Sequence, residues 1–213
     1  MAFDGITIAA MVSELNKNLS GGRINKIAQP ESDELLITGK GANGQKRLLL
    51  SASASLPLIY FTGKNRISPL TAPNFCMLLR KHIGSARITA IRQPGLERVV
   101  EFELEHLNEL GDVCHKVLIM ELMGKHSNII FCKEDGTILD SIKHVSAQVS
   151  SVREVLPGRT YFIPHTTEKE DPLTITEEAF HTLMKEASSP VQKALYQKLT
   201  GISPVIGTEL CHL

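Results

Sequence analysis

Residues 99–105 alternate between apolar and acidic side chains, in the order Val-Val-Glu-Phe-Glu-Leu-Glu. Because successive side chains on a β-strand point to opposite faces, this pattern predicts a strand with one buried face and one solvated face. Such strands are typical of antiparallel sheets, and the chain shows no regular alternation of strands with long helices, which a parallel sheet would need. The segment therefore favours an α+β fold with a mostly antiparallel sheet.

Other short apolar segments extend the predicted sheet on both sides of this strand. With it, they are residues 23–29, 34–40, 47–52, 58–61, 87–92, 96–105, 113–122, 127–132 and 137–143. Asn43-Gly44 and Glu134-Asp135-Gly136 separate pairs of these segments and predict tight turns, because glycine readily adopts a positive φ. We expect this sheet to belong to a domain that covers residues 1–172.

Two helices are predicted in the same domain. Apolar residues at positions 8, 11, 12 and 15 form the stripe of an amphipathic helix, which Gly21-Gly22 would end. Pro73 would open a second helix as its first residue, and Gly84 would end it. We expect His82 to pack in the core with the apolar face of that helix, and Arg80 and Lys81 to project from the other side.

Helical patterns replace strands in the last part of the chain, which we take as a second unit of residues 173–213 after a polar linker at residues 165–172. Thr176-Glu177-Glu178 predicts a helix start, and residues 191–199 predict another helix. A glycine-containing turn then leads to a helix that starts with proline. This order is typical of a helix-hairpin-helix, whose backbone N–H groups can bind phosphate, and also of helix corners that bind nothing. We expect the natural protein to continue beyond Leu213, since the third predicted helix runs to the chain end.

Charge is balanced overall but segregated along the sequence. The chain has 23 Lys and Arg against 23 Asp and Glu, so it is not a general binder of polyanions. Residues 64–98 nevertheless hold seven basic residues and one acid, and residues 99–112 hold five acids and no Lys or Arg. A basic face of this kind can hold a phosphate backbone, or can be a charged face that contacts only solvent. Composition does not decide between the two.

Several other classes of protein find no support in the sequence. The four cysteines lie far apart without metal-ligand spacing, so we expect no structural metal and no disulfide framework. Neither a phosphate-binding glycine loop nor a nucleophile-elbow motif occurs, and we expect no cofactor and no catalysis. No membrane span or leader is indicated, so a cytoplasmic location is expected.

Four segments together resemble the N-terminal domain of the NFACT family. They are residues 1–6, Phe75–Ile83, Gln93–Val99 and the Met-Gly-Lys-His-Ser-Asn run at 123–128. That family includes the NEMF and RqcH ribosome quality-control factors, and many bacterial members were named fibronectin-binding protein A. The resemblance implies a domain similar to the N-terminal domain of formamidopyrimidine-DNA glycosylases, followed by a helix-hairpin-helix.

The resemblance also implies a function. Members of the family bind the large ribosomal subunit when it is obstructed by peptidyl-tRNA, and recruit a tRNA, alanyl in bacteria, for untemplated tailing of the stalled chain. By resemblance, Glu97 and Arg98 match an acid-Arg pair that holds tRNA, although the family usually has Asp at the first position. The residues alone also allow Glu97 and Arg98 simply to cap a hairpin after Pro94-Gly95.

The remaining candidate residues are expected RNA or phosphate contacts. Lys125, His126 and Asn128 match the family's strand-end motif, while Arg80 and Lys81 are candidates from the basic helix. Base excision is not expected, because this chain has Ala2, Phe3 and Asp4 where glycosylases of that fold have an N-terminal proline and a glutamate. Two alternatives stay open: a fibronectin-binding adhesin, and a non-catalytic nucleic-acid-binding scaffold.

Overall fold

The computed structural model describes residues 3–164 and 168–213 of the 213-residue chain. Ala2 and residues 165–167 of the predicted linker lie outside the described residues. Nine strands form one sheet in the order β4-β3-β2-β1-β5-β6-β7-β8-β9, and all neighbours pair antiparallel. The predicted antiparallel α+β class is therefore confirmed. The strands are β1 Arg23–Ala28, β2 Glu34–Gly41, β3 Gly44–Ser51, β4 Leu58–Phe61, β5 Arg87–Arg92, β6 Val99–Leu107, β7 Val113–Glu121, β8 Asn128–Lys133 and β9 Ile138–Ser141.

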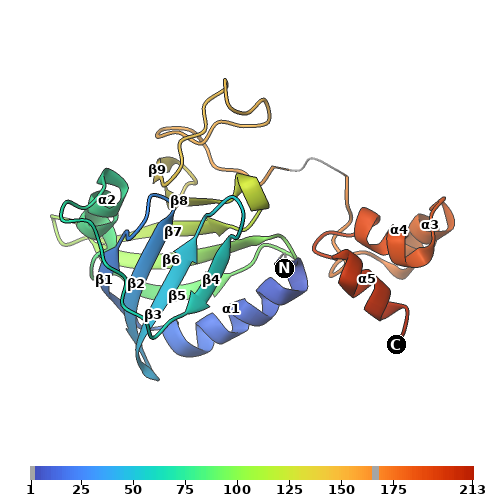
Figure 1. The fold of residues 1–213 in the computed structure, drawn as a ribbon, viewed down its shortest axis with the longest axis horizontal. Helices are drawn as coiled ribbons and strands as arrows, with labels where there is room; N and C mark the ends of the chain where they lie inside the picture. Colours follow the sequence, from blue (N-terminus) through green and yellow to red (C-terminus); the bar gives the residue numbers. More distant parts are fainter. Residues whose placement is uncertain (1–2, 165–167) are drawn as a thin grey trace.

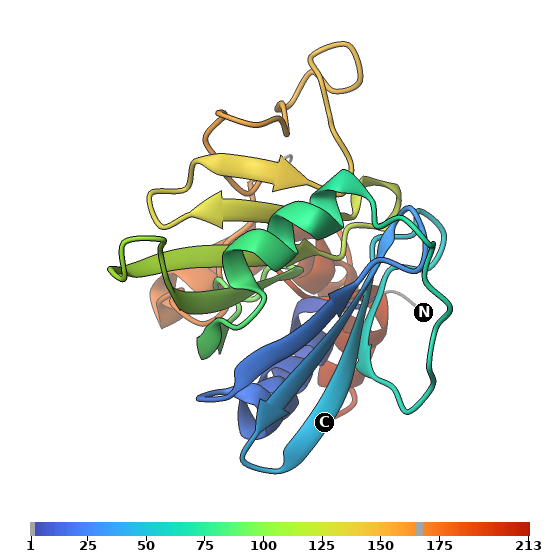
Figure 2. The same ribbon diagram turned by 90° about the vertical axis from the view of Figure 1, so that its left-hand side faces the viewer.

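The sheet is divided into two halves at the junction of β1 and β5, which pair only through Arg23 and Arg87. Figure 2 shows the half-sheet β1–β4 turned away from the half-sheet β5–β9, so that the two enclose a space. Apolar side chains from both halves fill it as one buried cluster, which includes Ile59 of β4 and Phe131 of β8. Packing of both halves on a common core makes them one structural unit.

Helices α1 (Gly5–Leu19) and α2 (Asn74–Ile83) close this unit (Figure 1). α1 packs against β2 and β5, and its predicted apolar stripe is confirmed, since Ile8 and Leu15 are fully buried. α2 packs against β1 and β6. It begins at Asn74, with Pro73 as the capping residue rather than the first helical residue.

Strand β6 begins at Val99, three residues after the predicted start at Leu96. Residues 93–98 form a turn instead, in which Gly95 has φ 51°. Leu96 is 8% exposed, so the apolar signal that suggested a strand residue is burial by tertiary packing. The predicted turns at Gly44 and Gly136 are confirmed, with φ 84° and 82°.

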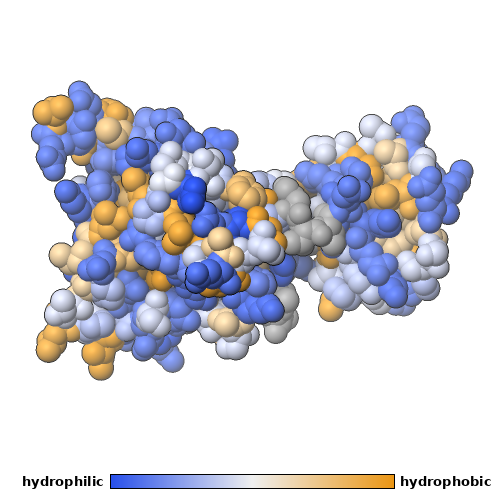
Figure 3. Space-filling model, turned by 90° about the horizontal axis from the view of Figure 1, so that it is seen from above, coloured by the Kyte–Doolittle hydropathy of each residue, from blue (hydrophilic) through white to orange (hydrophobic). Residues whose placement is uncertain are grey.

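We call residues 3–164 the sheet lobe and residues 168–213 the helical lobe. The helical lobe contains α3 Glu177–Lys185, α4 Val191–Lys198 and α5 Pro204–Leu210, around a small core of its own. Thr176 caps α3 as predicted, because its side chain accepts a hydrogen bond from the backbone N–H of Ala179. α5 ends at Leu210, so the expectation that the third helix runs to the chain end is wrong. Figure 3 shows the helical lobe standing beside the sheet lobe.

Two further properties concern the described residues only. Across residues 3–164 and 168–213, no helix combines the length and the apolar composition needed to cross a membrane. The same part of the chain holds no group of three His, Cys, Asp or Glu side chains placed to share a metal ion.

Candidate functional site

A groove of about 850 Å³ lies between the sheet lobe and the helical lobe. We call it the inter-lobe groove. Its lining comes from segments far apart in the sequence: Phe3 and Asp4, residues 96–98, parts of segments 123–128 and 143–155, Pro164 and Lys169, Tyr196 and residues 200–204. A concave site built from several segments at the boundary of two lobes is a common location for ligand binding.

The turn that carries Glu97 and Arg98 is tightly held by backbone hydrogen bonds. The N–H of Glu97 donates to the carbonyl of Pro94 (2.9 Å), and the carbonyl of Arg98 accepts from the N–H of Leu122 (2.9 Å). The side-chain amide of Gln93 donates to the carbonyl of Glu97 (2.9 Å) and to that of Gly5 (2.8 Å). Glu97 is half-buried and Arg98 is exposed. The backbone is thus fixed while the Arg98 side chain faces the groove.

The same turn is also held by close contact between the backbones of Gly5, Leu96 and Gly201. The N–H of Gly5 at the start of α1 donates to the carbonyl of Gly201 (2.9 Å) in the turn between α4 and α5. A Cβ on Gly5 would lie 2.2 Å from the carbonyl oxygen of Leu96, and a Cβ on Gly201 would lie 2.4 Å from it. Only glycine fits at these two positions without moving the turn, because any Cβ would overlap that oxygen.

A capping arrangement joins the two lobes beside this contact. One oxygen of Asp4 caps α1 by accepting from the N–H of Thr7 (2.8 Å), and the other accepts from the hydroxyl of Ser203 (2.6 Å). The same Ser203 oxygen caps α5 by accepting from the N–H of Ile206 (3.3 Å). Burial works to raise the pKa of Asp4, but the hydrogen bonds from Ser203 and Thr7 outweigh it, so this pKa lies below its ordinary value.

Positive charge gathers along the walls of the groove. Lys169 donates to the carbonyl of Tyr196 (2.7 Å), and its pKa is lowered by burial and by the nearby Arg98, with Glu97 acting in the opposite direction. Lys125 and His126 are exposed on the 3-10 turn Gly124–His126, which carries them to the opposite wall. Cations that line one groove favour an anionic ligand.

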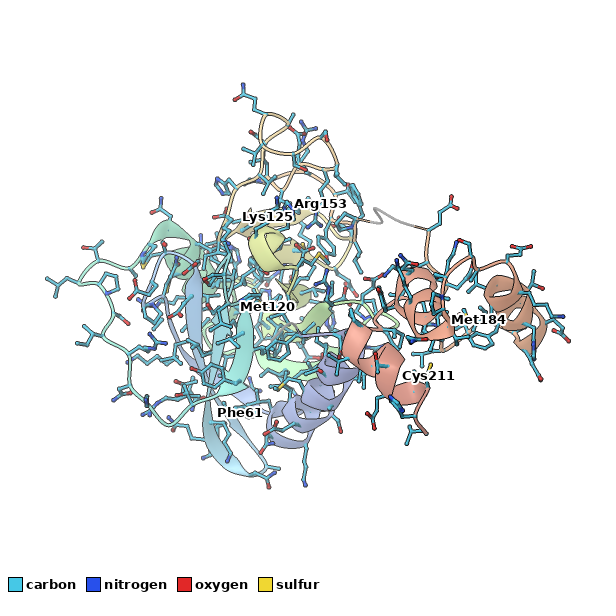
Figure 4. All side chains as sticks on the ribbon, turned by 45° about the vertical axis from the view of Figure 1, so that its right-hand side comes forward. Phe61, Met120, Lys125, Arg153, Met184 and Cys211 are labelled. Carbon is cyan, nitrogen blue, oxygen red and sulfur yellow. The ribbon has the colours of Figure 1, made fainter. Side chains whose placement is uncertain are left out.

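Sequence reasoning missed a buried ion pair behind this wall. Nη2 of Arg153 lies 2.7 Å and 2.5 Å from the two carboxylate oxygens of Glu121, which is fully buried at the end of β7. The hydroxyl of Tyr161 also donates to Glu121 (3.0 Å). Burial raises the pKa of Glu121, and the bonds from Arg153 and Tyr161 only partly oppose it. The available signal was an acid inside the apolar run 117–122. Figure 4 labels Lys125 and Arg153 on the same part of the sheet lobe.

The predicted site residues fall into three groups. Glu97, Arg98, Lys125 and His126 all line the inter-lobe groove. Asn128 also lines the groove, but it is 2% exposed, and its amide bonds the backbone N–H (3.1 Å) and carbonyl (2.9 Å) of Lys143. Its hydrogen-bonding groups serve the backbone, so we do not carry Asn128 forward as an RNA contact.

Arg80 and Lys81 lie on α2, at the end of the sheet lobe away from the helical lobe (Figure 1). Both are exposed as predicted, but Nε of Arg80 donates to the carbonyl of Ile27 (2.8 Å), so this arginine has a structural contact. His82 is half-buried beside Phe131, at 6.1 Å between ring centroids, as the core prediction required. A ligand confined to the groove does not reach these residues.

Comparison with known proteins identifies the family. The model of the NFACT N-terminal and middle domains matches residues 4–213. The chain belongs to the NFACT family. It is 38% identical over 215 residues to a protein named Rqc2 homolog RqcH of Bacillus subtilis, a match that covers 100% of this chain and 37% of that protein. It thus spans little more than a third of that relative's length.

Other NFACT relatives agree in sequence and in structure. The ribosome quality control complex subunit NEMF of Mus musculus is 24% identical over 204 residues, covering 96% of this chain and 18% of NEMF. The solved N-terminal structure of the fibronectin/fibrinogen-binding protein of Streptococcus suis superimposes with a TM-score of 0.90 at 36% identity, covering 99% of this chain and 79% of that one. The N-terminal domain of fibronectin-binding protein PavA of Streptococcus pneumoniae gives a TM-score of 0.88 at 36% identity, over 98% and 78% of the two chains.

Proposed function

We propose that this chain is the N-terminal module of a ribosome-associated quality-control factor. It binds the large ribosomal subunit obstructed by peptidyl-tRNA and recruits a tRNA, alanyl in bacteria, for untemplated tailing of the stalled chain. The names of its NFACT relatives, RqcH and NEMF, support the ribosomal role. Recruitment of tRNA rests on the inter-lobe groove.

The observation that carries the proposal is the convergence of Glu97, Arg98, Lys125, His126 and Lys169 on one groove. A guanidinium group can bind phosphate or the edge of guanine with two parallel hydrogen bonds, and a carboxylate can accept from an exocyclic amine of a base. Glu97 and Arg98 are adjacent on a backbone held in one conformation, so little entropy is lost when they engage a ligand. The groove therefore suits unpaired nucleotides together with their phosphates.

In this mechanism the chain binds and positions, and supplies no catalytic group. The braced turn presents Arg98 to RNA, while Lys125, His126 and Lys169 neutralise neighbouring phosphates. Peptide-bond formation would be the ribosome's own chemistry. The helix-hairpin-helix assignment for α4 and α5 belongs to the same proposal, with their turn lining one side of the groove.

The test is binding of purified alanyl-isoacceptor tRNA against other tRNAs across a salt series. We expect Arg98→Ala to weaken the alanyl tRNA complex by about tenfold or more, as loss of a charged bidentate contact does. The matched control is Arg159→Ala, which removes an exposed arginine paired with Glu154 outside the groove and should leave affinity nearly unchanged. Equal affinity of wild type and Arg98→Ala for every tRNA would overturn the site.

A second candidate function is binding of fibronectin, which the names of the streptococcal structures suggest. Immobilised fibronectin should then retain the chain at physiological salt, and Arg98→Ala should bind as well as wild type, because no nucleotide is involved. Retention of the chain together with indifference to tRNA would favour this function over the first.

A further inference from the structure

The outer face of β1–β3 carries an unusual alignment of positive side chains. Lys40 of β2 pairs with Arg23 of β1, and Arg23 pairs in turn with Arg87 of β5. Three cations thus lie in direct succession across three strands, about 4.8 Å apart from strand to strand. Directly opposed like charges destabilise a sheet, so this alignment is unfavourable in the free protein.

Two more cations extend the row along the strands. Lys26 pairs with Thr38, and Thr38 pairs with Arg47. We call Arg23, Lys26, Lys40, Arg47 and Arg87 the cationic face.

All five side chains point away from the core, because each is next in sequence to an inward-facing residue. Those inward neighbours are Ile24, Ile27, Gly39, Leu48 and Ile88.

The cationic face is largely exposed to solvent. Within the described part of the chain, none of the five forms an ion pair. The first acid along the row is Glu105, beyond Arg87 on β6. Four of the five are exposed and Arg47 is half-buried. Figure 2 shows α1 behind this half-sheet and no helix in front of it.

We propose that the cationic face is a second RNA-binding surface, which holds the phosphate backbone of an RNA duplex. A strand surface that carries neighbouring cations matches a row of phosphates by charge, and phosphate contacts supply most sequence-independent affinity. The residues between the cations are polar and non-aromatic, namely the exposed Asn25 and Gln45 and the buried Thr38, so no stacking platform for unpaired bases is present among them, and the exposed ring of Tyr60 lies farther away on β4. Backbone binding without base readout is the chemistry that remains.

The surface is separate from the inter-lobe groove. In Figure 2 the viewer faces β1–β3, and the helical lobe lies on the far side of the molecule. The chain therefore presents RNA-binding chemistry at two ends, which suits a module held between two RNA segments. This inference stands independently of the role assigned to Arg98.

The test uses this chain and a blunt 20-base-pair RNA duplex without loops as the probe. The variant Arg23→Gln/Lys40→Gln/Arg87→Gln should bind the duplex about tenfold or more weakly at low salt. The slope of the logarithm of its binding constant against the logarithm of the salt concentration should be shallower than that of wild type by about three. Its melting temperature should stay the same or rise, because two like-charge pairs are removed. Should loss of the Arg23 bond to the Ser85 carbonyl impair folding, Lys26→Gln/Lys40→Gln tests the same face with a slope change of about two.

A control with the same change in net charge is Lys185→Gln/Lys193→Gln/Lys198→Gln on exposed positions of the helical lobe. It should leave duplex affinity within about twofold of wild type. Equal losses in the control and the cationic-face variant would overturn the proposal, as would absence of duplex binding by wild type. Loss of binding to phosphatidylserine vesicles without loss of duplex binding would overturn it in favour of a membrane surface.

Discussion

The two lobes differ in the size of the apolar core that stabilises each of them. The sheet lobe has a continuous core shared by both half-sheets, with fully buried side chains such as Leu35, Ile59 and Phe131. The described residues of the helical lobe include four buried apolar side chains, Ala194, Leu195, Leu199 and Ile202, and its helices are otherwise largely exposed. Burial of apolar surface is the main favourable term in folding, so the sheet lobe can hold its shape alone while the helical lobe depends on docking. The wall of the inter-lobe groove that the helical lobe provides should therefore open by local unfolding more readily than the wall on the sheet lobe.

Charge is also handled differently in the two lobes. The sheet lobe buries the ion pair of Arg153 and Glu121, whose side chains are 9% and 0% exposed. In the helical lobe, the contact of His181 with Glu177 is mostly exposed. Exposed pairs contribute little, whereas removal of one partner from a buried pair leaves an uncompensated charge. The largest effects of substitution should therefore come from the sheet lobe.

The largest expected effect follows from Arg153→Met. Loss of the guanidinium leaves Glu121 buried without its counter-charge, and the free energy of unfolding at pH 8 should fall by about 3–5 kcal/mol. Burial already raises the pKa of Glu121 above 4.5, so the folded variant takes up a proton that the unfolded chain releases. The lost stability should therefore return as pH falls from 8 toward 4.5. Urea denaturation at several pH values measures both effects.

The control for that experiment is Arg159→Met, which breaks an exposed pair with Glu154. It should lower the free energy of unfolding by less than about 1 kcal/mol, without recovery at low pH. Similar losses in the two variants would show that the buried pair adds nothing special to the sheet lobe.

A medium effect is expected from Gly201→Ala, which targets the docking of the lobes. Gly201 has φ 76°, and an added Cβ would lie 2.4 Å from the carbonyl oxygen of Leu96. Strain and overlap should weaken docking by about 1–3 kcal/mol. Amide hydrogen exchange should accelerate in α4 and α5 while β6–β8 keep their protection.

Gly136→Ala is the matched control, because Gly136 has φ 82° but nothing lies within 4 Å of its added Cβ. It should strain the β8–β9 hairpin and leave α4 and α5 unaffected. Uniform acceleration across both lobes in Gly201→Ala would instead mean that the lobes unfold together, against the comparison drawn above.

The smallest expected effect is that of Asp4→Asn. Asparagine still accepts from the N–H of Thr7, so the cap of α1 stays, but the bond from Ser203 loses its charge and should weaken by about 1 kcal/mol or less. In wild type the pKa of Asp4 lies below 3.8, so its contribution is present above that pH and is lost as pH falls through the lowered pKa.

Amide NMR signals of Thr7 and Ile206 measure this difference. They should shift below pH 3.8 in wild type and stay constant there in Asp4→Asn. A shift of the same size in the variant would assign the titration to another group and remove Asp4 from the docking contact.

The strands and helices were predictable where local pattern determines structure. Alternation in residues 99–105 and glycines at tight turns identified the sheet, and spacing of apolar residues identified α1. The start of β6 was placed too early because Leu96 is buried against Gly5 and Gly201, far away in sequence. An apolar residue that is buried in a turn cannot be told from one that is buried in a strand by sequence alone, since both positions need an apolar side chain.

The candidate site was predictable only in part, for a related reason. Arg98, Lys125 and Asn128 were identified and line the same groove, but the Asn128 amide is bonded to the backbone, because a polar residue at a strand end can serve either a ligand or the backbone. Arg153 was missed because its partner Glu121 lies 32 residues earlier in the chain. Contacts between distant segments leave no local pattern in a single sequence.

The bond between Asp4 and Ser203 joins residues 199 positions apart, and this has a consequence for synthesis on the ribosome. All nine strands lie before residue 142, so the sheet can form while the helical lobe is still being made. At about 5–20 residues per second, the 40 residues from 164 to 203 take about 2–8 seconds to add. During that interval the nascent chain has Arg98 on a completed sheet but no second wall beside it. We therefore expect nascent molecules to complete the inter-lobe groove only after the sheet lobe has formed.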